Sequence, residues 1–260
     1  MSEILYNTPI EKYVINGKSI DVKRDDLQGN GKDLPPWGKL AAIEMILRSG
    51  EIDKSIPLIQ LSVRGSFSGW AFAALGTKHG YKIKIAYPNS KNFPVETINK
   101  WKMFDVELIP LRPNMSSVVL GQMKNYAKGN CFQYIPYGFE VPTYIDYWEK
   151  KLVTYDYDTL VVCAGTPVTC LGMIKGFRGR EIHLVATSKE KTVLRQLSKY
   201  KIEDDRVQIH TSPFDFYDEM KEHPAPFNCN RYWDRKVWHF IENNTEKLRG
   251  NTLFWNLGGD

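Results

Sequence analysis

Short apolar runs alternate with amphipathic segments along almost the whole chain. The run Leu-Val-Val-Cys at 160–163 has no polar position, which is typical of a strand covered on both faces, as in a parallel sheet. The segment at 39–48 instead has a broad apolar helical face and is followed by Ser49-Gly50, a common end to a helix. The two periodicities therefore predict strands and helices in turn.

Applied to the whole chain, the patterns predict an α/β protein. The strands are expected at 57–63, 82–87, 106–110, 131–136, 159–163, 182–186, 207–209 and 252–255. The helices are expected at 39–48, 68–79, 94–102, 118–128, 142–151, 168–176, 189–197 and 234–243. This alternation predicts a doubly wound fold with mostly parallel sheets and helices on both faces.

Composition narrows the class of protein. The chain has 260 residues, of which 42% are apolar and 25% charged, the balance of an ordinary soluble globular protein. No apolar run reaches the roughly 18 to 20 residues that cross a bilayer, and Met1-Ser2-Glu3 does not begin a secretory signal. The four cysteines form no CxxC pair and have no histidine at metal-ligand spacing. We therefore expect a cytoplasmic protein with no membrane contact and no metal site.

The net charge of +5 is modest, and the basic residues are scattered. It permits binding of an anionic cofactor or of nucleic acid and requires neither. The aromatic content of 13% also leaves both possibilities open, because aromatic residues serve cores and interfaces more often than base stacking.

Two turns between a predicted strand and a predicted helix carry residues suited to anions. In doubly wound folds, ligands bind beyond the carboxyl ends of the strands. The turn from Gly165 to Thr169 can offer backbone N–H groups and hydroxyls to a phosphate. In the turn 64–69, glycine and serine allow a carboxylate to approach the backbone. Taken alone, each turn is better explained as an ordinary helix cap.

Lys39 directly precedes the apolar stripe of the first predicted helix. A lone lysine at such a position usually extends into solvent. If Lys39 faces a cleft instead, desolvation and a neighbouring cation favour its uncharged amine and make it a nucleophile that forms imines. Lys32 is a second candidate on chemical grounds alone.

Taken together and in order, several segments resemble the tryptophan-synthase-β-like (fold type II) family of pyridoxal-phosphate enzymes. The most similar branch contains aminocyclopropane-carboxylate deaminase and D-cysteine desulfhydrase. The register of Gly38-Lys39 relative to Glu44 matches the family's cofactor-lysine helix and selects Lys39 over Lys32. The other matching segments are 22–27, 68–81, 135–138, 165–169, 232–236 and 256–259.

The resemblance implies a fold type II α/β architecture and pyridoxal 5'-phosphate as the cofactor. It implies one enzyme unit over 1–260, in which a smaller subdomain at about 50–135 is inserted in a larger one made of 1–49 and 136–260. A homodimer is also implied.

The resemblance further assigns roles at the cofactor. Lys39 would be the catalytic residue that holds the cofactor as an internal aldimine, a Schiff base, and moves protons at the substrate α-carbon. Asp234 would lie near the pyridine nitrogen and keep it protonated. The cofactor phosphate would be held by Gly165, Thr166, Val168 and Thr169.

Substrate contacts are implied for the loop Ser66, Phe67 and Ser68 and for Trp233. Here the chain departs from the family, because Phe67 replaces an Asn or Gln that hydrogen-bonds the cofactor ring. Pro167 also stands in the phosphate loop, where it has no N–H to donate, and Gly38 stands where Asn is common.

The favoured function is that of a pyridoxal-phosphate enzyme of the deaminase or lyase type, acting at the α-carbon of a small amino acid or amino-acid-like group. One alternative is a decarboxylase or lyase that acts on an amino acid attached to a nucleic-acid base, as in DNA hypermodification. The second alternative is a pseudoenzyme that keeps the fold only for binding.

Overall fold

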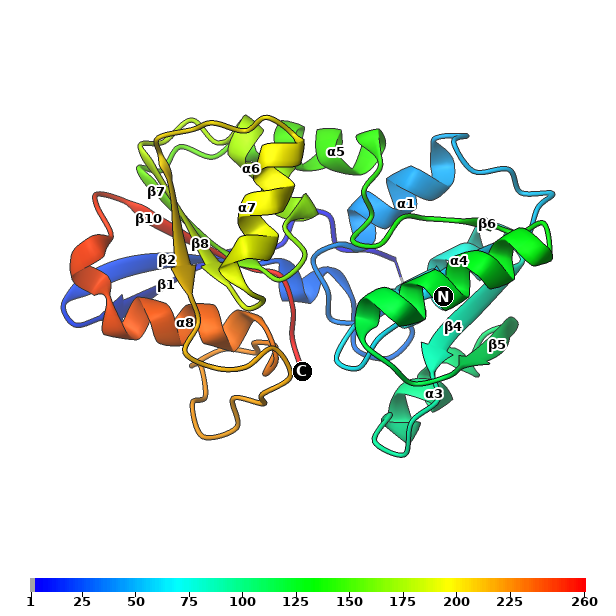
Figure 1. The fold of residues 1–260 in the computed structure, drawn as a ribbon. Coiled ribbons are helices and arrows are strands. Elements are labelled where there is room, and N and C mark those ends of the chain that lie inside the picture. Colours follow the sequence, from blue (N-terminus) through cyan, green and yellow to red (C-terminus); the bar gives the residue numbers. More distant parts are fainter. Residues whose placement is uncertain (1–2) are drawn as a thin grey trace.

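The computed structural model describes residues 3–260, which form two sheets in two lobes (Figure 1). The larger sheet has the strand order β1-β2-β10-β7-β8-β9. Every neighbouring pair is parallel except the first, β1 and β2. Its strands are β1 (Ile10–Ile15), β2 (Lys18–Arg24), β7 (Thr159–Ala164), β8 (Glu181–Ala186), β9 (Val207–Thr211) and β10 (Thr252–Asn256).

The smaller sheet has the order β5-β4-β3-β6 and is parallel throughout. Its strands are β3 (Leu58–Leu61), β4 (Ile83–Pro88), β5 (Val106–Leu111) and β6 (Gln133–Tyr134). The helices are α1 (Leu40–Arg48), α2 (Ser68–Lys78), α3 (Val95–Trp101), α4 (Ser116–Gly129), α5 (Pro142–Leu152), α6 (Val168–Gly176), α7 (Glu190–Lys199) and α8 (Asp234–Asn243). Two short 3-10 helices, η1 (Asp25–Gln28) and η2 (Thr245–Lys247), complete the list.

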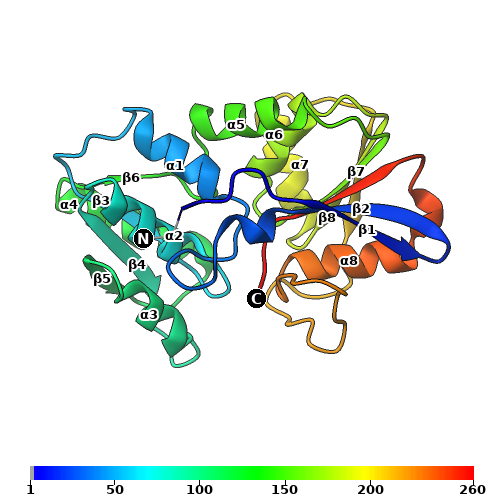
Figure 2. The same ribbon diagram turned by 180° about the vertical axis from the view of Figure 1, so that it is seen from behind.

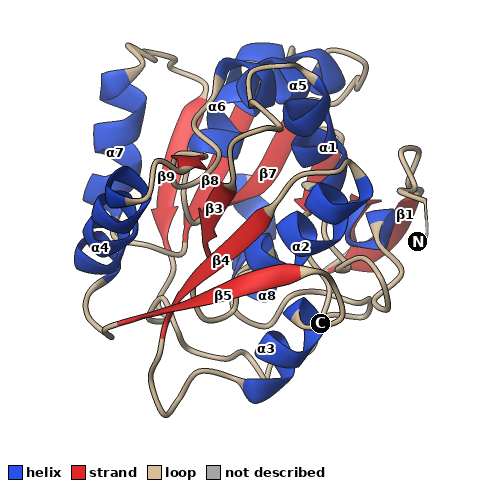
Figure 3. Cartoon of the chain, turned by 90° about the vertical axis from the view of Figure 1, so that its right-hand side faces the viewer, coloured by secondary structure: helices blue, strands red, loops and turns tan. Residues whose placement is uncertain are grey.

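Helices cover both faces of each sheet, as the alternation of side chains along the strands requires. In β7, Leu160 and Val162 face the core that contains α5 and α6, whereas Val161 faces α8 on the other side. Seen from behind, α8 lies below this sheet and α5 and α6 above it (Figure 2). In the smaller sheet, α2 and α4 lie on opposite faces (Figure 3). One core cluster continues through α1, α2, α5 and α6 and joins the two lobes.

The predicted fold class is confirmed, and all eight predicted helices are present with ends shifted by two residues at most. The strand predicted at 131–136 is reduced to Gln133–Tyr134 because Cys131 adopts a left-handed φ of 55°. The hairpin of β1 and β2 was not predicted. Its turn, Asn16-Gly17, has two positive φ angles, the conformation that a two-residue hairpin turn needs.

The four strands of the smaller sheet all lie between residues 58 and 134. The proposed subdomain boundaries at about 50 and 135 remain a prediction. None of the helices within residues 3–260 combines the length and the apolar character needed to cross a membrane.

Candidate active site

The main pocket lies where the carboxyl ends of β3, β7 and β10 meet, between the two lobes. This is the position at which doubly wound folds bind ligands. Most of the site residues predicted from the sequence line it, namely Lys39, Ser66, Phe67, Ser68, Gly165, Thr166, Trp233 and Asp234. Val168 and Thr169 stand behind this lining, in the first turn of α6.

Lys39 is placed by backbone pairing between two distant segments. The Gly38 N–H donates to the Leu257 carbonyl at 2.7 Å, and the Gly259 N–H donates to the Pro36 carbonyl at 2.8 Å. A Cβ on residue 38 would lie 2.6 Å from the Cβ of Asp25, so this position has no room for the family's Asn. The departure at Gly38 therefore has a steric explanation in this chain.

The Lys39 amine lies in the pocket, 5.5 Å from the centre of the Trp37 ring, a favourable cation–π distance. Within residues 3–260 its Nζ forms no ion pair with a carboxylate. Lys32, the other candidate, is exposed and does not line the pocket. The structure thus brings to the site the lysine that the register had selected.

Asp234 is the first residue of α8 and is only 2% exposed. Burial raises the pKa of its carboxyl group to about 7, although the Leu257 N–H, which donates to it at 3.1 Å, and the charge of Lys39 act in the opposite direction. A Cβ at Gly258 would lie 3.2 Å from Asp234 Oδ2. A glycine here lets the backbone come close to the carboxylate.

The turn after β7 offers unused donors. Within the described chain, no hydrogen bond occupies the N–H groups of Gly165, Thr166, Val168 or Thr169. The first bond of α6 runs from Leu171 N–H to the carbonyl of Pro167, as expected for a helix start. Pro167 therefore interrupts the row of N–H groups without removing it.

The side chains of the two threonines in this turn lie in different surroundings. Thr166 lines the pocket, where its side chain also lies beside Gly138, whose φ is +79°. Thr169 is buried, and its hydroxyl is 2.8 Å from the hydroxyl of Tyr144 on α5. Thr169 can thus offer the pocket its N–H group, while its hydroxyl fixes α6 against α5.

The loop after β3 presents hydroxyl groups and one aromatic ring. The Ser68 N–H donates to Ser66 Oγ at 3.1 Å, so the two serines hold each other in place. Phe67 packs edge-on against Trp37 and Trp70, with ring centres 6.2 and 6.3 Å away. The Phe67 side chain therefore makes this wall of the pocket apolar where the family has an amide.

Two buried amides in the pocket were missed in the sequence. Gln60 on β3 has a buried Oε1 with no hydrogen-bond partner within residues 3–260. Asn230 accepts the N–H groups of Tyr232 and Trp233 at 3.0 and 3.2 Å and donates to the Gly259 carbonyl. A polar residue inside an apolar strand was the available signal for Gln60, whereas nothing in the sequence marked Asn230.

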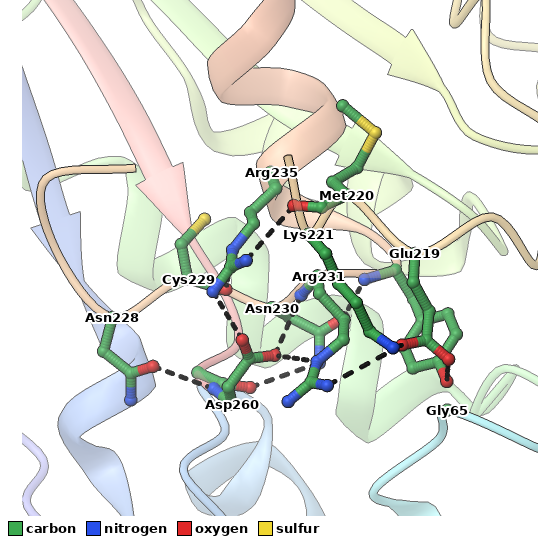
Figure 4. Close-up of polar contacts among 12 residues, drawn as sticks. Gly65, Glu219, Met220, Lys221, Asn228, Cys229, Asn230, Arg231, Arg235 and Asp260 are labelled. Atoms are coloured by element: carbon green, nitrogen blue, oxygen red, sulfur yellow. Dashed lines mark hydrogen bonds and ion pairs between the residues drawn. The ribbon is translucent and has the colours of Figure 1, made fainter. Parts of the chain in front are cut away.

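A network of charges holds the segment that carries Asn230 and Trp233. The side chain of Asp260 lies between Arg231 and Arg235, and Lys221 lies 3.0 Å from Glu219 (Figure 4). Hydrogen bonds from Tyr232 and Lys221 lower the pKa of Glu219 to about 2. The network thus fixes one wall of the pocket through ion pairs.

The buried cysteines do not provide a reactive thiolate. Burial raises the pKa of Cys170 to about 12, and it raises the pKa of Cys163, which lines the pocket, still further. Thiolates are the nucleophilic form of cysteine. Neither of these cysteines is therefore suited to act as a nucleophile in this pocket.

No protein-family model matches the chain. The chain is 22% identical to the glycyl-dTMP PLP-dependent decarboxylase of Pseudomonas phage M6, over 98% of this chain and 99% of that protein. Among solved structures, it is similar to an ACC deaminase homologue with a TM-score of 0.76 and 15% identity, covering 99% of this chain and 91% of the other. It is also similar to the O-acetylserine dependent cystathionine beta-synthase from Helicobacter pylori, with a TM-score of 0.75, 14% identity and coverage of 99% and 94%. The expected resemblance is thus confirmed, and the chain has the fold type II architecture of pyridoxal-phosphate enzymes.

Proposed function

We propose that this chain is a pyridoxal-phosphate-dependent decarboxylase that acts on an amino acid carried by a thymine nucleotide. The observation that carries the proposal is the pocket in which Lys39, Asp234 and the turn from Gly165 converge. The phage decarboxylase, which matches nearly end to end, supports the choice of reaction and carrier. Of the functions considered from the sequence, this is the nucleic-acid-base alternative.

The residues of the pocket fit the cofactor. The N–H groups from Gly165 to Thr169 and the Thr166 hydroxyl suit a phosphate. The buried carboxyl of Asp234 has a pKa of about 7, so it suits a ring nitrogen with which it can share a proton. The unpartnered Gln60 Oε1 marks a polar contact that the protein itself leaves unmade.

When bound, pyridoxal phosphate supplies an electron sink for the bond that breaks at the α-carbon. Lys39 would hold the cofactor aldehyde through its amine. Once the substrate amine has replaced it there, the freed Nζ would deliver a proton to the α-carbon in place of the carbon dioxide that leaves. Asp234 holds a proton at the ring nitrogen through its carboxyl oxygens.

The walls of the pocket favour loss of a carboxylate. Within residues 3–260, Lys39 is the single cationic side chain that lines it, so no arginine holds the substrate carboxylate. The rings of Trp37, Phe67 and Phe139 form a joined apolar wall. An apolar surround disfavours a carboxylate relative to neutral carbon dioxide.

The first test is spectroscopic. Purified protein with pyridoxal phosphate should show an absorbance band that borohydride reduction removes. The reduced cofactor should then remain covalently attached to Lys39. Lys39→Ala should lack this band, and Lys32→Ala, an exposed lysine seven positions earlier, is the matched control. A protein that binds no cofactor would refute the proposal and favour the pseudoenzyme.

The second test identifies the reaction. A thymine nucleotide that carries glycine on its base should release carbon dioxide. Release of ammonia and a keto acid from free amino acids, without carbon dioxide, would instead show a deaminase. We further propose a homodimer that works in the cytoplasm, which sedimentation of the purified protein and fractionation of the producing cells can test.

A further inference from the structure

A second cavity adjoins the pocket and shares two of its walls. Val63 lines both spaces. The next residue, Arg64, lines the second cavity, whereas residues 65–68 line the pocket that contains Lys39. On the other side, Phe216 lines the first and Tyr217 the second, with ring centres 4.8 Å apart. Two chain segments, at 63–68 and at 216–217, therefore run along both spaces.

The second cavity lies at the carboxyl ends of the neighbouring strands of the smaller sheet. Pro88 ends β4, and Pro113 and Asn114 follow β5. The hydroxyl of Tyr217, from the larger lobe, is 3.4 Å from Ser116 Oγ at the start of α4. The cavity is thus bounded by both lobes, as the active site is.

One cation, Arg64, lines this cavity, and two more are sequence neighbours of its lining residues. Arg64 pairs with Glu219 at 3.1 Å, but the same carboxylate also pairs with Lys221. Lys91 and Arg112 are exposed and lie next to the lining residues Ser90 and Pro113. Neither Lys91 nor Arg112 has an ion-pair partner within residues 3–260. The chain segments next to the cavity therefore carry two exposed cations, Lys91 and Arg112, that no described carboxylate pairs with.

The rest of the lining is mixed, with aliphatic side chains at Val63, Pro88, Pro113 and Val119 beside polar and aromatic ones. It includes the side chains of Ser90, Asn92 and Asn114 together with the rings of Phe93 and Tyr217. Hydroxyls and amides can bond a sugar, and exposed cations such as Lys91 and Arg112 attract phosphate. The carboxylates of Asp215 and Asp218, on the same loop as Tyr217, do not line the cavity.

We propose that this second cavity binds the sugar and phosphate of the nucleotide that carries the amino acid. This inference rests on the proposed function, because the sugar and phosphate are the parts of the proposed substrate that do not react. The amino acid enters the pocket of Lys39, while the carrier extends past Val63 and Tyr217 toward Lys91 and Arg112. The phosphate can belong to a free nucleotide or to a DNA strand.

The kinetic test compares three substrates that carry the same glycyl thymine: the nucleoside, its 5′-monophosphate and a single-stranded oligonucleotide. Wild type should prefer the two that carry phosphate. In Lys91→Gln/Arg112→Gln, the ratio of kcat/KM for phosphate-bearing substrate to nucleoside should fall about tenfold, as expected when about two phosphate contacts are lost. Lys175→Gln/Arg178→Gln removes the same charges from exposed positions at the far end of α6 and should keep the ratio. An unchanged ratio in Lys91→Gln/Arg112→Gln would overturn the inference.

A binding test separates this inference from the proposed reaction. Cofactor-loaded protein should bind unmodified oligothymidylate with salt-dependent affinity, measured by fluorescence anisotropy, and thymidine 5'-monophosphate should compete if a single phosphate suffices. Asn92→Trp, which fills the cavity from an exposed position, should weaken binding while the cofactor absorbance stays. If wild type and both cavity variants bind oligothymidylate and thymidine 5'-monophosphate equally, the subsite does not exist, whatever reaction the enzyme performs.

Discussion

Replacement of Asp234 by Asn should change how the stability of the cofactor-free protein depends on pH. The Asp234 carboxyl is buried, and its pKa rises from the ordinary value of 3.8 to about 7. Because the folded state favours the protonated form, this group destabilises the fold once it ionises. The stability that the protonated carboxyl contributes is fully present below pH 3.8 and is lost as the pH rises toward 7.

The size of the effect follows from the same values. At about 1.4 kcal/mol per pH unit, the rise from 3.8 to about 7 corresponds to about 4 kcal/mol between pH 4 and pH 8. Asn keeps an oxygen for the Leu257 N–H bond but carries no charge at any of these pH values. Asp234→Asn should therefore gain stability relative to wild type as pH rises.

Urea unfolding of the apoprotein at several pH values measures this difference. His210 has a pKa lowered to about 4 by burial, so it acts in the opposite direction between pH 4 and 6.5. The subtraction of the Asp234→Asn curve from the wild-type curve removes that common contribution. If the difference in unfolding free energy between wild type and Asp234→Asn does not change between pH 4 and pH 8, the pKa of Asp234 is not raised to about 7.

Three further predictions concern single positions. Gly38→Ala should lower the free energy of unfolding by about 2 kcal/mol and weaken the cofactor band, because its Cβ would lie 2.6 Å from that of Asp25; urea unfolding and absorbance check this. Thr166→Val should weaken pyridoxal-phosphate binding about tenfold in a spectroscopic titration, the effect of one lost bond to a charged phosphate. His210→Gln should reduce the loss of stability as pH falls from 6.5 to 4, since a half-buried neutral histidine must take up a proton there. Equal acid sensitivity of His210→Gln and wild type would contradict the last prediction.

The fold was predictable because its signals are local. Apolar runs such as 160–163 and the helical stripe after Lys39 report directly on burial. The hairpin of β1 and β2 was missed although Asn16-Gly17 is a strong turn signal, because the strand Ile10–Ile15 is an edge strand whose side chains are exposed or half-buried. Periodicity of burial says little about such a strand.

The site was only partly predictable, since its residues meet through distant contacts. Lys39 and Asp234 were found through motif register, and the structure places both in one pocket. The orphaned amide of Gln60 and the bracing amide of Asn230 depend on neighbours that no sequence pattern identifies. The role of Thr169 as a brace for Tyr144 likewise depends on how α5 packs against α6.

The pairing of 36–38 with 257–259 also sets the order in which the protein can become active. β10 lies in the middle of the larger sheet, between β2 and β7, and its following turn supplies the Leu257 N–H that Asp234 accepts. During synthesis, Lys39 emerges from the ribosome long before that strand exists. A nascent chain therefore contains Lys39 before the pocket around it can form. Completion of the pocket thus waits for the insertion of β10 into the middle of the larger sheet.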